Sequence, residues 1–112
     1  MAELTLRSYV DEHGRVPFEA WVLDLDRQAQ AKVTIALSRL QRGNMSNVEG
    51  VGEGVCELKL DWGPGYRVYF GQEGRTIVIL LCGGTKKRQS RDIAAAKVRW
   101  ADYKARKSAR PR

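Results

Sequence analysis

The continuous apolar run at residues 76–82, TIVILLC, constrains the fold of this chain more than any other segment. A strand with one face in water alternates apolar and polar residues, whereas this run is apolar at successive positions. It therefore predicts a central β-strand that is covered on both faces. A chain of 112 residues has room for one such core. We expect a single domain over residues 1–106, followed by a disordered basic tail over residues 107–112.

Shorter patterns predict the elements that surround this strand. Residues 3–10 alternate as a half-buried strand does, and from Pro17 onward the apolar residues follow helical spacing. Asp26 is placed to cap a second helix, which Gly43 would end. Residues 44–54 show no periodicity and predict an irregular connector.

Three strand patterns follow the connector, at residues 55–62, 66–70 and 76–82, and short glycine-containing turns join them. They predict a three-stranded antiparallel meander. A last helical pattern covers residues 89–106. The order β-α-α-β-β-β-α indicates a small α+β domain in which helices pack on one antiparallel sheet.

In the first hairpin of the meander, alternate residues of each strand lie on opposite faces of the sheet. If Gly63, Pro64 and Gly65 form a three-residue loop, Trp62 lies opposite Tyr66, and the apolar residues of both strands share one face. The other face is then polar, and its residues are Glu57, Lys59, Asp61, Arg67 and Tyr69. This arrangement predicts that Arg67 and Tyr69 point to the polar side.

The charge of the chain is concentrated near its C-terminus. Eleven of the 20 Lys and Arg residues, but only two of the 13 Asp and Glu residues, lie in residues 85–112. A segment of this charge density is attracted to polyanions, because its cations displace the counterions of phosphate groups. The alternative is a solvated helix face with a basic tail.

Other site chemistries have little support in the composition. Cys56 and Cys82 lie singly in apolar stretches, and His13 is the only histidine, so we expect reduced thiols, no metal and no cofactor. No apolar run approaches the roughly 20 residues of a membrane span, and the N-terminus lacks the pattern of a secretion signal. We expect a cytoplasmic protein.

Two blocks of sequence resemble a known family. The runs GVCELKLDWGPGYRVYF and LLCGGTKKRQSRDIAAAK are similar to the addiction-module killer branch of the RelE/ParE toxin superfamily, near the HigB-like toxins. The resemblance implies a type II toxin that a cognate antitoxin, typically of the helix-turn-helix type, holds inactive. The best-known members cut mRNA in the ribosomal A site without a metal ion, whereas other branches inhibit DNA gyrase.

Metal-free RNA cleavage needs a base, an acid and cations that stabilise the charge growing on phosphorus. Arg67 suits the last role, since its planar fork matches phosphate oxygens, and it aligns by resemblance with the family's phosphate-binding arginine. The alternative is a salt bridge to Glu57 or Asp61. Lys86 matches the family lysine; together with Lys87 it completes the predicted catalytic set, unless this turn is merely a solvated basic segment.

Five further residues are predicted to bind nucleic acid. Tyr69 offers a ring for stacking on a base, and Gln89 matches the family glutamine and offers an amide for a base or phosphate. The other three are cations near the same turn or on the last helix: Arg88, Arg91 and Lys97. The resulting hypothesis is a ribosome-dependent mRNA endonuclease toxin. The alternatives are a gyrase inhibitor and a plain nucleic-acid-binding module.

Overall fold

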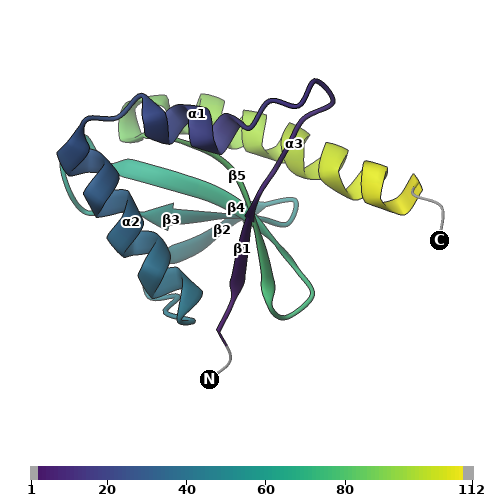
Figure 1. Ribbon diagram of the computed structural model, residues 1–112, viewed down its shortest axis with the longest axis horizontal. Coiled ribbons are helices and arrows are strands. Elements are labelled where there is room, and N and C mark those ends of the chain that lie inside the picture. Colours follow the sequence, from purple (N-terminus) through teal and green to yellow (C-terminus); the bar gives the residue numbers. More distant parts are fainter. Residues whose placement is uncertain (1–2, 110–112) are drawn as a thin grey trace.

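A five-stranded mixed sheet forms the middle of the molecule in the computed structural model, which describes residues 3–109 (Figure 1). The strand order across the sheet is β1-β5-β4-β3-β2. The first strand pairs with β5 in parallel, and the other neighbours are antiparallel. The strands are β1 (Thr5–Ser8), β2 (Val48–Gly52), β3 (Val55–Lys59), β4 (Tyr66–Glu73) and β5 (Ile77–Thr85).

Helices cover both faces of this sheet. Helices α1 (Pro17–Leu23) and α2 (Arg27–Gln41) contribute core side chains to one face, and α3 (Gln89–Ala109) contributes them to the other. One 3₁₀ turn, η1 (Lys86–Arg88), connects the end of β5 to the start of α3. In Figure 1 the yellow end of α3 extends beyond the sheet toward the C-terminus.

The predicted α+β class is confirmed, but the prediction of a purely antiparallel sheet is wrong. A parallel pair needs a crossover of about a dozen residues or more, and α1 and α2 supply that crossover after β1. The segment predicted as a connector also contains a strand, β2. Its glycines and its register shift between Gly50 and Gly52 hide the alternation by which a strand is recognised.

Two further boundaries differ from the sequence predictions. Helix α3 continues to Ala109, so residues 107–109 of the predicted disordered tail are helical, whereas residues 110–112 lie outside the described part of the chain. The hairpin loop spans residues 61–65, and Leu60 rather than Trp62 faces Tyr66, since the Leu60 amide donates to the Tyr66 carbonyl. The observed register differs from the predicted one by two residues. Because side chains alternate with a period of two, each residue keeps its predicted face, and the predicted division into faces is confirmed.

Local signals for the helix ends act as predicted. Pro17 is the first residue of α1. The Asp26 carboxylate accepts a hydrogen bond from the Ala29 amide at 2.8 Å and caps α2. Gly43, with φ of 89°, follows the end of α2 in the left-handed region that favours glycine.

The two faces of β5 belong to two separate clusters, as its continuous apolar sequence predicts. Val78 and Leu80 pack in the cluster under α1 and α2, and Ile79 and Leu81 pack in the cluster under α3. All four side chains are buried. Each face of the sheet is therefore closed to water at its centre.

Two tryptophans bring the helices close to the sheet by packing on glycine. A methyl group on Gly71 of β4 would lie 2.5 Å from the indole ring of Trp100, which projects from α3. On the opposite face, the ring of Trp21 from α1 lies equally tightly over Gly83 of β5. Since no side chain separates ring from backbone, both helices approach the central strands closely.

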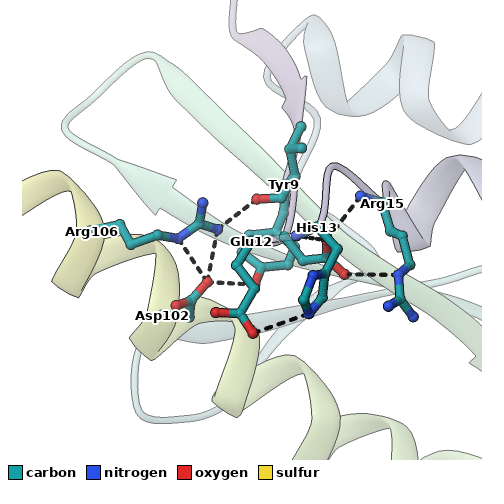
Figure 2. A network of polar contacts seen from close by, with 8 residues as sticks. Tyr9, Glu12, His13, Arg15, Asp102 and Arg106 are labelled. Carbon is teal, nitrogen blue, oxygen red and sulfur yellow. Dashed lines mark hydrogen bonds and ion pairs between the residues drawn. The ribbon is translucent and has the colours of Figure 1, made fainter.

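The distal half of α3 is held by the first loop of the chain (Figure 2). The Tyr9 hydroxyl donates to Asp102 Oδ2 at 2.6 Å. Arg106 donates from Nε to the same oxygen at 2.9 Å and from Nη2 to the Val10 carbonyl at 2.5 Å. Burial raises the pKa of Tyr9, while the hydrogen bond from Tyr9 lowers the pKa of Asp102.

We predict that Gly71→Ala lowers the free energy of unfolding by about 1–3 kcal/mol, the usual cost of overpacking, because the new methyl group overlaps the Trp100 indole. Urea or thermal denaturation measures this. Gly50→Ala is the matched control, since Gly50 also lies in a strand but has no atom within 4 Å of its added methyl group. Equal midpoints for the two variants would contradict the packing described above.

Candidate functional site

Arg67 lies near the start of β4, beneath the beginning of α3, and its side chain is only 8% exposed. Its Nη1 donates to the carbonyl of Gly65 at 2.6 Å. Its Nε lies 3.7 Å from Glu57 Oε2, so the guanidinium and carboxylate form an ion pair inside the protein. The cross-strand salt bridge considered from the sequence is therefore present with Glu57; Asp61 lies in the hairpin loop instead.

Glu57 is the centre of a buried polar cluster, which we define as Glu57, Arg67, Tyr69, Gln89 and Asp92. The Glu57 side chain is fully buried, and its Oε2 also accepts a hydrogen bond from Gln89 Nε2 at 2.8 Å. Within the described residues its other oxygen, Oε1, has no hydrogen-bond partner. Burying a carboxylate costs free energy unless the carboxylate is paired. The Glu57 carboxylate therefore favours the positions in which Arg67 and Gln89 contact it.

Tyr69 occupies the predicted face but is not open to solvent. The ring is fully buried in the cluster under α3, and burial followed by the nearby Glu57 carboxylate raises the pKa of its hydroxyl. The expectation of an accessible polar face is wrong here because α3 covers it. The conformation described leaves no room for a nucleotide to stack on this ring.

Asp92 is a cluster member that the sequence analysis did not select. It lies in the first turn of α3, and its Oδ2 sits against the backbone of Gly84, where a side chain would collide with it. Burial raises the pKa of Asp92, although Arg88, Arg91 and Arg99 act in the opposite direction. The adjacent Gly83-Gly84 pair is the sequence signal for such a close approach.

The predicted basic turn is exposed and lies beside Arg67. Lys86, Lys87 and Arg88 form η1, all three are exposed, and they line an open hollow of about 610 Å³ together with Gln89, Ser90 and Arg91. Lys86 also contacts the hairpin loop, since its Cβ lies 3.2 Å from the position that a methyl group on Gly65 would take. The Arg67 guanidinium and the Cβ of Lys86 thus both lie close to Gly65.

Lys97 is separated from this turn. It lies two turns further along α3, where its ammonium group is 3.4 Å from the carboxylate of Glu53 and packs close to Gly52. Of the sequence-predicted residues, the structure therefore brings together Arg67 and the residues from Lys86 to Arg91. Lys97 pairs with the turn that follows β2 instead.

The described residues contain no group of three or more His, Cys, Asp or Glu side chains arranged to hold a metal ion. Cys82 is buried, and burial raises the pKa of its thiol to about 11. The charged groups of the cluster and of the hollow are three guanidinium groups, two ammonium groups and two carboxylates, and Gln89 adds an amide. Such a set suits binding and charge stabilisation of a phosphate.

Comparison with known proteins gives the family. The family model for phage-derived Gp49-like proteins (DUF891) matches residues 20–102, a range that includes every residue of the site. The chain belongs to the Gp49-like family. This is a RelE/ParE-like toxin family of toxin–antitoxin systems, so the resemblance read from the sequence is confirmed at that level.

The Gp49-like chain also has a relative in Haemophilus influenzae. That uncharacterized protein is 43% identical over 82 residues, which make up 72% of this chain and 83% of the relative. None of the helices between residues 3 and 109 is both long enough and apolar enough to cross a membrane.

We predict that Glu57→Gln lowers the free energy of unfolding by about 3 kcal/mol, because the buried Arg67 guanidinium loses its only charged partner in the cluster. Chemical denaturation at neutral pH measures this. Glu49→Gln is the matched control: Glu49 lies directly opposite Glu57 on β2, and its ion pair with Lys59 is exposed. Similar losses in both variants would contradict a structural role for the buried pair.

The raised pKa of Asp92 predicts that the free energy of unfolding depends on pH. Its raised pKa means that the folded state holds the Asp92 proton more tightly than the unfolded state, so its contribution to stability falls as pH rises through that range. We expect Asp92→Asn to melt at a higher temperature relative to wild type at pH 7 than at low pH. A constant difference across the pH range would show that Asp92 titrates normally.

Proposed function

We propose that this protein is the toxin of a type II toxin–antitoxin system and that it acts as a metal-independent, ribosome-dependent mRNA endonuclease. Family membership supports the toxin role. The observation that supports the nuclease is the meeting of Arg67 and Lys86 at Gly65, from two separate stretches of chain. The proposal includes that the toxin belongs to the HigB-like branch.

In this proposal Arg67 stabilises the negative charge that develops on the scissile phosphate. One hydrogen bond, from Nη1 to the Gly65 carbonyl, and one ion pair, between Nε and Glu57 Oε2 at 3.7 Å, position the guanidinium. A preorganised cation is worth more in catalysis than a mobile one, because it needs no reorganisation in the transition state. Gln89 acts through Glu57, since its amide donates to the same carboxylate oxygen.

Lys86 and Lys87 supply the proton transfers. The amine of one lysine accepts the proton of the 2′-hydroxyl as that oxygen attacks the neighbouring phosphorus. The bond to the 5′-oxygen breaks, a 2′,3′-cyclic phosphate forms, and the ammonium group of the other lysine gives the leaving 5′-oxygen a proton. Both lysines are exposed and line the open hollow, so they are accessible to a bound strand. Arg88 and Arg91 line the same hollow and attract the phosphates on either side.

The proposed partners follow from the same charge distribution. The substrate is mRNA on the ribosome in the cytoplasm, and the inhibitor is a cognate antitoxin, typically of the helix-turn-helix type. An acidic antitoxin segment is complementary to the hollow at residues 86–91, because exposed cations there outnumber carboxylates.

The test is growth arrest on induction without antitoxin, combined with mapping of transcript 5′ ends. We expect the double variant Lys86→Gln/Lys87→Gln to remain folded and to lower the cleavage rate at least about a hundredfold, the lower end of what general acid–base catalysis contributes. Arg67→Lys keeps the charge but loses the fork, and we expect a similar loss. The control Arg7→Gln/Arg75→Gln removes two exposed cations that lie outside the hollow.

New codon-linked ends that disappear in the Lys86/Lys87 variant support the proposal. Intact transcripts together with double-strand breaks in DNA would contradict it and favour a gyrase inhibitor. Full toxicity of the folded Lys86/Lys87 variant would contradict this assignment of the site.

A further inference from the structure

Helix α2 carries a basic surface that the overall charge of the N-terminal part conceals. Between residues 27 and 42 the chain has four cations and no carboxylate, although residues 1–84 as a whole are slightly acidic. The cations are Arg27, Lys32, Arg39 and Arg42. All four are exposed, so this helix presents only positive charge to solvent.

Two of these cations border a hollow between α2 and the hairpin of β3 and β4. It has a volume of about 280 Å³, just below the roughly 300–1,000 Å³ of small-molecule sites, and so suits one planar ring. Its rim carries Lys32, Arg39 and Lys59, and its apolar lining includes Ala36, Leu58 and Leu60. We call it the α2 hollow.

Trp62 gives the α2 hollow an aromatic wall. The Lys32 ammonium lies 5.6 Å from the centre of the indole ring, and the ring stacks on Tyr66 at 6.0 Å with an angle of 26° between the planes. Trp62 is half-buried, and Asp61 and Asn47 complete the lining beside it. Cations that line a groove together with an aromatic ring are the features by which proteins bind single-stranded nucleic acid.

The α2 hollow and the hollow at residues 86–91 both adjoin one short loop, residues 61–65. Within it the Gly65 amide donates to the Trp62 carbonyl at 3.2 Å. Trp62 contacts Lys32, and Gly65 contacts both Arg67 and Lys86. A strand bound at Lys86 therefore has to cross only this loop to reach α2.

We propose that the α2 hollow is a second binding site for single-stranded RNA, in which one base replaces the Lys32 ammonium on the Trp62 ring, and Lys32 and Arg39 bind the flanking phosphates. This inference rests on the proposed function, because it extends the path of the same RNA away from the cleaved bond. Asp61 on the rim repels phosphates but accepts a hydrogen bond from an exocyclic amino group, as on cytosine or guanine.

RNA fits this surface better than an acidic protein segment does. The hollow accommodates one ring and adjoins a second cationic hollow, whereas an acidic helix would need several apolar pockets at helical spacing. The Lys59 charge is already offset by Glu49 at 3.4 Å, which leaves Lys32 and Arg39 as the phosphate contacts.

The experiment measures binding of a short fluorescent single-stranded oligoribonucleotide to the full chain over a range of salt concentrations. We expect Lys32→Gln/Arg39→Gln to reduce the slope of log affinity against log salt by about 0.7 for each phosphate contact removed. We expect Trp62→Ala to weaken binding about tenfold with little change in that slope. Arg7→Gln/Arg75→Gln is the control with the same loss of charge away from α2.

Thermal melting of each variant shows whether it is folded. If Trp62→Ala fails to fold, the Lys32→Gln/Arg39→Gln variant still tests the inference. Wild-type affinity and salt slope in a folded Lys32/Arg39 variant would overturn the inference. A loss equal to that of the control would overturn it as well, since only net charge would then matter.

The outcomes separate this site from the catalytic one. If the Lys32/Arg39 variant binds RNA as wild type does, but co-produced antitoxin no longer neutralises it, the surface belongs to a protein and the inference is wrong. A wild-type protein that cuts transcripts but does not bind the oligonucleotide also overturns the second site alone. Absence of transcript cleavage, with RNA binding retained at both hollows, would overturn the nuclease function and leave the binding site standing.

Discussion

The burial of the central strands on both faces is the constraint on which the rest of this structure depends. In β4 and β5 alternate side chains enter two different apolar clusters, and no part of either strand's centre reaches water. Polar side chains on these strands or on β3 can then pair only with one another or with α3, and among the described residues Glu57 Oε1, Arg67 Nε and the Tyr69 hydroxyl keep no hydrogen-bond partner. Trp21 and Trp100 reinforce the constraint by packing their rings directly on glycine backbone, which brings α1 and α3 close to the sheet.

The candidate site follows from that constraint. Glu57 and Arg67 face α3 from neighbouring strands, directly below its first turn, and they pair because neither charge can be hydrated there. The pairing orients the guanidinium toward Gly65, where Lys86 also lies. A buried ion pair thus holds a guanidinium beside the loop that Lys86 approaches.

Two hollows of this protein are lined by several cations each. The hollow at residues 86–91 is visible in the sequence as a cluster of neighbouring cations. The α2 surface is not, because the carboxylates of other segments cancel its charge in the count for the N-terminal part. The hairpin loop at residues 61–65 joins the two places, with Trp62 on one side and Gly65 on the other.

The sequence by itself determined the α+β class, the covered strand at residues 76–82, the cap at Asp26 and the division of the hairpin into faces. Each of these depends on periodicity or on the chemistry of a few adjacent residues. Only the tertiary structure decided that β1 runs parallel to β5, that residues 48–52 form an edge strand and that Glu57, Arg67 and Tyr69 are buried. Alternation shows which side chains of the hairpin share a face. Whether that face is exposed to solvent depends on α3, whose first residue, Gln89, is 32 residues from Glu57 in the chain.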